Sequence, residues 1–165
     1  MIRNAEPKDA KAICDIYNYY VLNTIVTFEE DMVQAEDMAE RIKTVLEKYT
    51  WLVFENEGEI VGYAYAGEWK SRCSYRFSVE SSVYLKHGLS GQGIGSKLYS
   101  ALFKALEKTD IHAIIGGISL PNEGSIALHE KFGFEKVAQF KEVGFKFDKW
   151  IDVGYWEKII GKVKK

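Results

Sequence analysis

The order of the predicted elements places this chain of 165 residues in the mixed α/β class, of the α+β type, with one sheet flanked by helices. The elements run strand, two helices, three strands, helix, strand, helix and two strands. Three successive strands precede a glycine-rich stretch at 88–95. In a doubly wound sheet strands and helices alternate, so this order excludes that fold. No change of composition marks a boundary, so we expect a single domain over residues 1–165.

The first half of the chain predicts a short strand, two helices and a hairpin. Pro7 suits the first turn of a helix, and the apolar residues after it recur at helical spacing up to Val21. Asn56 and Gly58 lie between two apolar runs and tolerate the positive φ of a tight turn, so these runs form an antiparallel hairpin. The predicted ranges are a strand at 2–4, helices at 7–21 and 35–48, and strands at 51–54 and 60–66.

The second half predicts the remaining strands around two helices. Val79, Ser81, Val83 and Leu85 alternate with more polar residues, the period of a strand with one buried face. Gly133 suits the left-handed residue that ends a helix. The predicted ranges are a strand at 77–85, a helix at 94–105, a strand at 111–119, a helix at 122–131, and strands at 135–140 and 152–159.

Composition and charge narrow the classes of partner. The formal net charge is −2, so we expect neither nucleic acid nor an anionic membrane as a partner. Cys14 and Cys73 are far apart and lack ligand spacing, so we expect no metal site, no disulfide and a reducing compartment. The first residues lack the apolar stretch of a secretory signal and no long apolar run follows, so we expect a cytoplasmic protein.

The glycine-rich stretch from Ser90 to Ser96 is a candidate anion site. Glycines allow the backbone to approach a ligand closely, and the free N–H groups at the start of the following helix attract phosphate. A P-loop is excluded because Lys97 follows Ser96 instead of preceding it. A dinucleotide-binding loop is excluded because it would follow the first strand of a βαβ unit. A coenzyme A pyrophosphate site and a plain turn without ligand both remain open.

Two motifs resemble those of the GNAT superfamily of N-acetyltransferases. Gly93 and Gly95 match the glycines of its Gln/Arg-x-x-Gly-x-Gly/Ala signature, although Ser90 stands at the leading Gln/Arg position. Asn122 and Ser125 match its Asn-x-x-Ala/Ser-x-x-x-Tyr motif, and His129 stands at the Tyr position. Within the superfamily the chain is most similar to phosphinothricin and methionine sulfoximine acetyltransferases. The stretches that carry this similarity are 49–53, 63–70, 80–84, 120–122 and 143–146.

The resemblance implies a fold, a reaction and an assembly. The fold would be a twisted, mostly antiparallel sheet flanked by helices. The reaction would move an acetyl group directly from acetyl-CoA, without a metal, to the primary amine of a small amino-acid-like molecule. Members of this subfamily are commonly homodimers, which would place Phe145 and Trp150 near an interface.

The resemblance also assigns residues that bind acetyl-CoA. The backbone of the strand ending at Leu85 would pair with the pantetheine arm, and one of its N–H groups would bind the thioester oxygen. Asn122 could equally be a helix N-cap, and Lys131 could equally be a solvated lysine. The predicted cofactor-binding residues are Val83, Tyr84, Leu85, Gly91, Gln92, Gly93, Ile94, Gly95, Ser96, Asn122, Ser125 and Lys131.

Two residues are candidates for proton transfer. An amine is mostly protonated at neutral pH, so a carboxylate must accept a proton, and Glu80 lies three residues before the expected pantetheine-binding segment. The alternative is a solvent-facing carboxylate. His129 would protonate the departing thiolate or serve as the base, and the alternative is a helix histidine that donates to a backbone carbonyl.

The acceptor site is the least specified part of the prediction. Arg72 is the candidate for an acceptor carboxylate or phosphinate, because a guanidinium binds two oxygens at once, with Arg76 and Lys146 as weaker alternatives. Two rival functions stay open: acetylation of a peptide or protein, and a non-catalytic CoA-binding module. The predicted acceptor-binding residues are Phe28, Arg72, Phe77, Glu80, Ser81, Ser82 and Tyr84.

Overall fold

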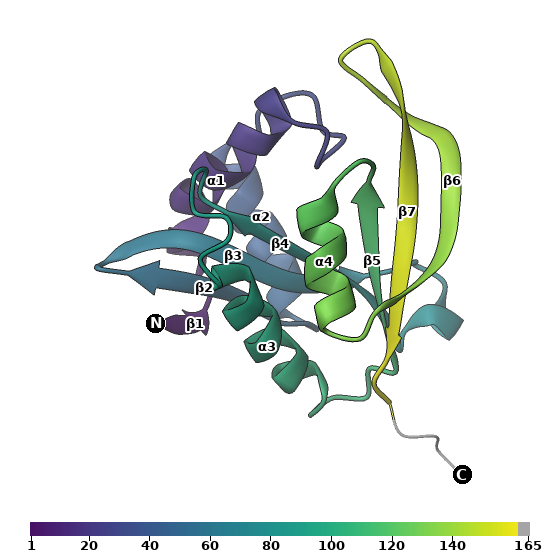
Figure 1. The fold of residues 1–165 in the computed structure, drawn as a ribbon. Coiled ribbons are helices and arrows are strands. Elements are labelled where there is room, and N and C mark those ends of the chain that lie inside the picture. Colours follow the sequence, from purple (N-terminus) through teal and green to yellow (C-terminus); the bar gives the residue numbers. More distant parts are fainter. Residues whose placement is uncertain (162–165) are drawn as a thin grey trace.

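One seven-stranded sheet, in the order β1-β2-β3-β4-β5-β7-β6, organises the chain (Figure 1). The structure is a computed structural model that describes residues 1–161. The strands are β1 (Ile2–Asn4), β2 (Trp51–Asn56), β3 (Glu59–Glu68), β4 (Ser78–Leu85), β5 (Ala113–Ser119), β6 (Glu135–Lys146) and β7 (Lys149–Ile159). The helices are α1 (Ala10–Asn23), α2 (Ala35–Leu46), α3 (Ile94–Leu106) and α4 (Glu123–Lys131), with 3-10 turns at Pro7–Asp9 and Cys73–Tyr75. None of the helices within residues 1–161 has the length and apolar character needed to cross a membrane.

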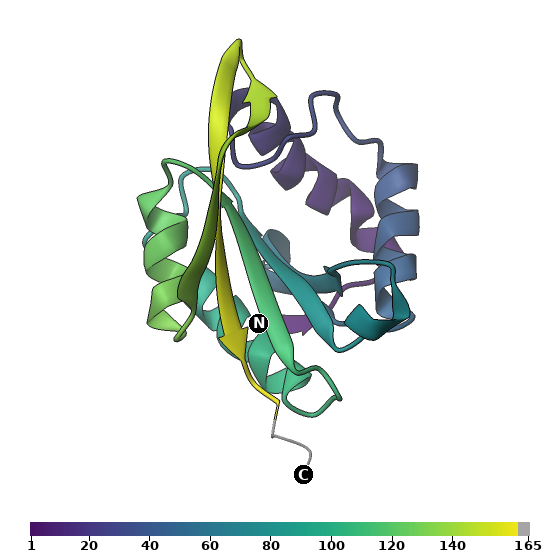
Figure 2. The same cartoon turned by 90° about the vertical axis from the view of Figure 1, so that its right-hand side faces the viewer.

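The helices cover the two faces of the sheet in pairs (Figure 2). The core beneath α1 and α2 contains Ile13, Ile42 and Trp51, and the core on the opposite face contains Leu98, Leu102 and Ile114. α1, α2 and α3 each bury an apolar stripe, and these stripes supply most of the helical side of the two cores. The predicted fold class and element order are confirmed, including the mostly antiparallel sheet.

Strands β4 and β5 pair in parallel and separate along their length. Residues Ser78, Val79 and Glu80 pair with Ala113, Ile114 and Ile115, and within residues 1–161 the pairing of these two strands ends there. Beyond Glu80 the second half of β4 therefore lacks a neighbour on its β5 side, while β3 continues to pair with it as far as Leu85. This separation opens a gap in the middle of the sheet.

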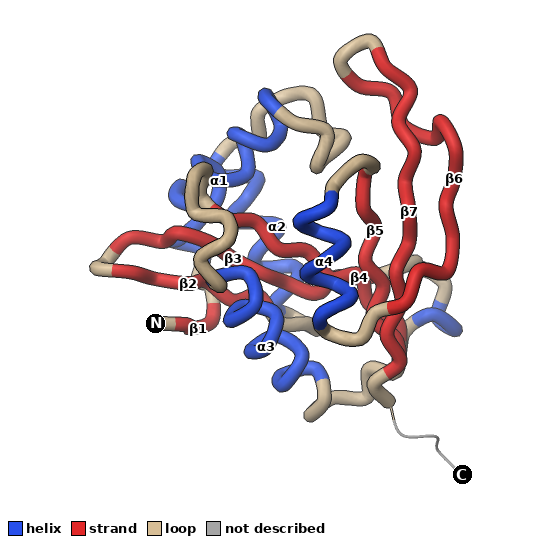
Figure 3. Tube along the Cα trace, in the orientation of Figure 1, coloured by secondary structure: helices blue, strands red, loops and turns tan. Residues whose placement is uncertain are grey.

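The last two strands form a longer hairpin than the sequence predicted. They meet at a two-residue turn of Phe147 and Asp148, where the prediction had a loop from 141 to 151 (Figure 3). Both turn residues have positive φ, 53° and 56°, without the Asn-Gly pair that normally marks such a turn. An irregularity between Phe140 and Gly144, with Glu142 at φ 53°, also breaks the alternation of side chains. Because the turn lacks Asn-Gly and the alternation of side chains is broken, the sequence does not predict a continuous hairpin.

Candidate functional site

The gap between β4 and β5 exposes backbone groups of alternate residues of β4. The N–H of Lys86 donates to the carbonyl of Val61 at 2.8 Å, which fixes the hydrogen-bonding register of β4 and β3. In that register the backbone groups of Tyr84 point to β3, whereas those of Val83 and Leu85 point into the gap. The hydroxyl of Tyr20 donates to the carbonyl of Leu85 at 2.7 Å. Of the three residues predicted to pair with pantetheine, only Val83 and Leu85 present backbone groups to the gap.

A groove of about 530 Å³ runs from this gap to the glycine-rich loop. Most of the predicted cofactor-binding residues line it: Val83, Leu85, Gly91, Gly93, Gly95, Ser96, Asn122, Ser125 and Lys131. Three do not, namely Tyr84, whose ring packs on the other face of the sheet, Gln92, which is exposed, and Ile94, which is buried in the core. The gathering of two distant motifs in one groove supports a ligand site over a plain turn.

The loop before α3 presents free N–H groups to the groove. Gly91 and Gly93 adopt positive φ, 80° and 78°, a region that side chains with a Cβ rarely occupy. Gly93 caps α3 without a side-chain acceptor, so the first N–H groups of the helix have no internal partner. Lys131 of α4 donates to the hydroxyl of Ser96 at 3.1 Å and adds positive charge at the same place. This end of the groove is suited to a pyrophosphate.

The N-terminal part of α4 forms the other wall of the groove. Asn122 Oδ1 accepts a hydrogen bond from the N–H of Ser125 at 3.1 Å, so its N-cap role is confirmed while it also lines the groove. The predicted cofactor-binding residues lacked six that line the groove: Tyr20, Val26, Ser90, Gly124, Ala127 and Leu128. Those on α4 could have been found from their helical spacing to Ser125 and Lys131. Tyr20 and Val26 gave no such signal because they come from a distant segment.

Glu80 lies at the point where β4 and β5 part, on the face covered by α1 and α2. Its Oε1 would lie 3.2 Å from a Cβ built on Gly117, beside the ring of Tyr155. The carboxylate has no hydrogen-bond or salt-bridge partner that the structure records among residues 1–161. Burial disfavours its charged form and raises the pKa of Glu80 above the ordinary value for a glutamate. A partly buried carboxylate with a raised pKa at a gap is suited to accept a proton.

Side chains of β4 alternate between the two faces of the sheet. We call the face that carries Glu80 and is covered by α1 and α2 the acceptor face, because the resemblance implies that the acceptor binds near Glu80. Ser82 and Tyr84 share the face of Glu80, and the ring of Tyr84 packs against those of Tyr17 and Tyr63 at 5.2 and 5.4 Å. Ser81 does not face the acceptor with them, although it was predicted to. It points to the opposite face, where its Oγ lies 3.5 Å from the hydroxyl of Tyr99.

His129 is 3% exposed and does not line the groove. Its Nδ1 lies 2.7 Å from the carbonyl of Ser125, which can only accept, so Nδ1 carries the hydrogen. Its Nε2 therefore accepts from the hydroxyl of Tyr99 at 3.2 Å. Burial lowers the pKa of His129 and is partly opposed by the Ser125 carbonyl. The imidazole is thus a neutral, hydrogen-bonded group behind the groove, as the alternative interpretation expected.

The remaining predicted acceptor residues are scattered. Phe28 is 40% exposed and lies against Gly144 of β6. Arg72 is exposed just before the short turn that precedes β4. Phe77 lines cavities near Ile111, at the opposite end of β4 from the gap. The structure therefore brings Glu80, Ser82 and Tyr84 together but not these three residues.

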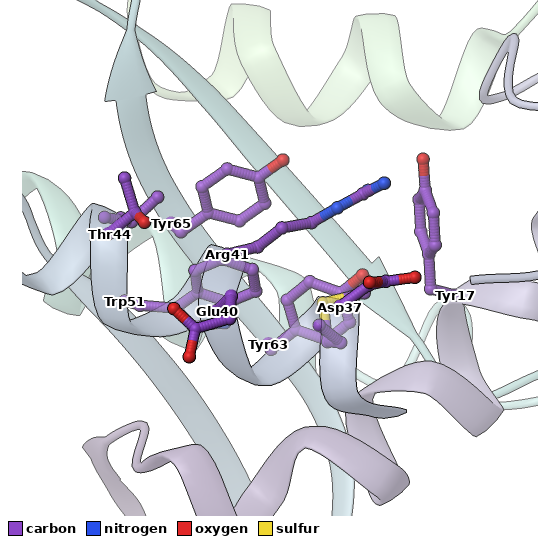
Figure 4. Close-up of a pocket in the computed structure, with 10 residues that line it drawn as sticks. Tyr17, Asp37, Glu40, Arg41, Thr44, Trp51, Tyr63 and Tyr65 are labelled. Carbon is purple, nitrogen blue, oxygen red and sulfur yellow. The ribbon is translucent and has the colours of Figure 1, made fainter. Parts of the chain in front are cut away.

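A second cavity, of about 570 Å³, lies between α2 and the acceptor face of β2 and β3 (Figure 4). The stacked rings of Trp51 and Tyr65, 4.2 Å apart, contribute to its wall. Arg41 extends across it toward Tyr17 and binds Glu29 through two hydrogen bonds, at 2.6 and 2.9 Å. The described residues contain no group of three or more His, Cys, Asp or Glu side chains placed to hold a metal ion.

A groove suited to a pyrophosphate and a pantetheine arm, beside a sheet that splits at a carboxylate, is the arrangement of an acyl-CoA transferase site. The chain belongs to the GNAT family, because the family model described as an acetyltransferase (GNAT) domain matches residues 2–154. It is therefore an acetyltransferase, as the resemblance predicted.

Curated relatives and solved structures agree with this family. A phosphinothricin N-acetyltransferase of Streptomyces viridochromogenes is 37% identical over 95% of this chain and 86% of its own length. An L-methionine sulfoximine/L-methionine sulfone acetyltransferase of Salmonella typhimurium is 36% identical over 94% of this chain and 91% of its own.

Two crystal structures share the fold along almost the whole chain. A phosphinothricin acetyltransferase of Sinorhizobium meliloti in complex with acetyl-CoA has a TM-score of 0.94 at 35% identity, covering 98% of this chain and 88% of its own. A ribosomal-protein-alanine N-acetyltransferase of Brucella melitensis has a TM-score of 0.93 at 36% identity, covering 96% and 99%.

Proposed function

We propose that this enzyme acetylates the primary amine of a small amino-acid-like acceptor, such as phosphinothricin, methionine sulfoximine or methionine sulfone. The observation that carries the proposal is the gap between β4 and β5. It joins a groove suited to acetyl-CoA on one face of the sheet to the carboxylate of Glu80 on the other. The curated relatives with this fold act on those acceptors.

In this proposal the groove holds acetyl-CoA along its length. The N–H groups at the start of α3 and the ammonium of Lys131 bind the pyrophosphate. The backbone groups of Val83 and Leu85 bind the pantetheine arm as an added strand. An N–H of this pair donates to the thioester oxygen and stabilises the charge that develops on it during attack.

Glu80 acts as the general base of a direct transfer. The carboxylate accepts a proton from the acceptor ammonium, directly or through a water molecule, and the freed amine attacks the thioester carbon. The carbon–sulfur bond then breaks, and the CoA thiolate takes up the proton that the attacking nitrogen loses as the amide forms. His129 is buried away from the groove and its Nε2 carries no hydrogen, so it does not supply this proton; we propose that it orients Tyr99 by accepting the hydrogen of its hydroxyl.

The same proposal covers the acceptor anchor, the assembly and the location. Arg72 binds the acceptor carboxylate or phosphinate. The exposed apolar side chains of the β6–β7 hairpin, which include Phe145 and Trp150, form the interface of a homodimer. The chain works as a single cytoplasmic domain.

The test is release of free CoA thiol from acetyl-CoA across a panel of amines. The panel holds phosphinothricin, methionine sulfoximine, methionine sulfone, free amino acids, polyamines and a peptide that begins with alanine. We expect selective turnover of the first three. Turnover of none of these small acceptors, with acetyl-CoA bound, would overturn the substrate class.

Peptide acetylation is the second candidate function. The similar Brucella melitensis structure is of a ribosomal-protein-alanine N-acetyltransferase, which is the observation that favours it. Turnover of the alanine peptide alone would select this function and retain the chemistry of Glu80. We place it second because both curated relatives described above act on free amino-acid analogues.

A further inference from the structure

The segment 24–34, between α1 and α2, has no regular secondary structure but lies on the acceptor face. The Oγ1 of Thr27 lies 2.7 Å from the hydroxyl of Tyr17. The ring of Tyr17 packs edge-on against Tyr84, which shares its face of β4 with Glu80. Val26, one residue earlier, lines the acetyl-CoA groove. The position of this segment therefore affects the space in which the acceptor meets the thioester.

Lys146, the last residue of β6, holds this segment from the hairpin side. It is 3% exposed, and its Nζ donates to the backbone carbonyl of Thr27 at 2.7 Å. No carboxylate lies within salt-bridge distance in the described part of the chain; burial lowers the pKa of its ammonium, and the negative charge of Glu30 partly opposes this. A lysine is almost never buried without a counter-charge, because removing an ammonium from water is costly. The fold accepts that cost at a contact between two segments 119 positions apart.

A second contact of the same hairpin lies beside the first. A Cβ built on Gly144 would lie 2.3 Å from the ring of Phe28, so only glycine lets this ring lie against β6. Thr27 and Phe28 are thus both held by β6, one by a hydrogen bond and one by close packing.

The next residue is held from the opposite side. Glu29 accepts a hydrogen bond from Tyr17 of α1 and two from Arg41 of α2. Three consecutive residues therefore connect to three elements: Thr27 and Glu29 to α1, Glu29 to α2, and Thr27 and Phe28 to β6. Lys146 supplies the hydrogen bond that links this segment to the hairpin. Its acceptor is the backbone carbonyl of Thr27, so the bond does not depend on the Thr27 side chain.

We propose that Lys146 is a positioning residue for acetyl transfer: by holding the Thr27 carbonyl it fixes the segment 24–34 over the acceptor side of the β4–β5 gap. Lys146 was predicted as a weak candidate for direct contact with the acceptor. Its burial instead makes it act through Thr27 and Phe28. The kinetic part of this inference rests on the proposed amine acceptors.

The test replaces Lys146 with methionine, which keeps the apolar stem and removes the donor. With methionine sulfone as acceptor, Lys146→Met should raise the KM for the acceptor about 10- to 100-fold, because a segment that is no longer held in place must be ordered when the acceptor binds. The Kd for acetyl-CoA should change less than the acceptor KM does, because most of the groove lining lies on β4, the glycine loop and α4, and Val26 is its contribution from the segment 24–34. Lys149→Met is the matched control, since Lys149 is exposed and lies opposite Lys146 in the hairpin register.

Hydrogen exchange followed by mass spectrometry separates failure of this inference from failure of the proposed acceptor. In Lys146→Met the amides of 24–34 should exchange at least about tenfold faster, while β4 and α3 keep their protection. Lys149→Met should exchange like the wild type. If the wild type does not turn over methionine sulfone but this exchange pattern holds, the acceptor is wrong and the positioning contact stands.

Unchanged exchange in 24–34 would overturn the inference. A lower kcat with an unchanged acceptor KM would overturn it too, because a loss of stability alone reduces the active fraction, and with it kcat, without changing KM. If Lys146→Met does not fold, Gly144→Ala takes its place. The added Cβ must displace the Phe28 ring and should raise the acceptor KM in the same direction. An acceptor KM unchanged in a folded Gly144→Ala enzyme would also count against the inference.

Discussion

The two sides of β4 differ in how far apart in the sequence their residues lie. On the cofactor side, the groove draws most of its wall from two short stretches, 90–96 and 122–131, joined by the end of β4. On the acceptor side, Glu80 meets Gly117 of β5 and Tyr155 of β7, and the neighbouring wall comes from Tyr17 and Thr27. A phosphate can be bound by consecutive backbone N–H groups, so its site can be local in sequence. An amine acceptor needs side chains in a particular arrangement, and these come from distant segments.

The largest expected effect tests the acceptor side. Glu80→Gln should lower kcat near neutral pH by about 10²- to 10⁴-fold, because the amide cannot accept the proton of the ammonium. Steady-state rates and the Kd for acetyl-CoA measure the two sides separately, and the Kd should stay close to the wild-type value.

Glu68→Gln is the matched control for this substitution. Glu68 is exposed on β3 and pairs with Val79, so the same chemical change occurs one strand away. Equal rate losses in both variants would show that Glu80 is not the base.

Two consecutive glycines of β5, Gly116 and Gly117, face opposite sides of the sheet, so substituting each one tests one side. A Cβ on Gly116 would lie 2.5 Å from Nε2 of the buried His129 ring, whereas one on Gly117 would lie 3.2 Å from Oε1 of Glu80. Gly116→Ala should lower stability by about 1–3 kcal/mol, or the melting temperature by roughly 2–12 °C, because the core must move. Gly117→Ala should reduce kcat with little change of melting temperature. The reverse pattern in thermal unfolding and rate assays would contradict this assignment of faces.

The glycine loop gives a smaller effect, confined to the cofactor side. Gly93→Ala forces a Cβ into a left-handed conformation that costs about 1–2 kcal/mol, so acetyl-CoA should bind roughly 5- to 30-fold more weakly if the loop relaxes. Titration calorimetry measures the change. Gly58→Ala is the control, because Gly58 has a similar φ, 82°, in the distant β2–β3 turn. Gly58→Ala should lose stability without losing acetyl-CoA affinity, and an equal loss of affinity would exclude a local role for Gly93.

The smallest effect is in the pH dependence of the rate. In the proposed mechanism the ionised form of Glu80 is the base, and burial raises its pKa. The rate should therefore fall as the pH drops through a value above the usual glutamate pKa of about 4.3, and reach a plateau at higher pH. A profile of kcat/KM for the acceptor checks this. An acid limb at the ordinary glutamate pKa would mean that Glu80 is solvated in the working enzyme.

Much of the cofactor side could be predicted because its signals are local. The glycines at 91, 93 and 95 and the pair Asn122 and Ser125 stand at fixed spacings, and each acts through its own or neighbouring backbone. The acceptor side was predicted less well. Ser81 was expected beside Glu80, but adjacent residues of a strand face opposite sides of the sheet, so only one of them can contact the acceptor.

The sequence by itself determined the family, the element order, the glycine-rich loop before α3 and the position of Glu80 before the end of β4, because periodicity and short motifs encode them. Only the tertiary structure decided that β4 and β5 part after Glu80, that His129 is buried behind Tyr99, and that Lys146 reaches Thr27. Each of these depends on contacts between residues far apart in the chain. Such contacts follow from how the sheet and its helices pack together, which no local pattern records.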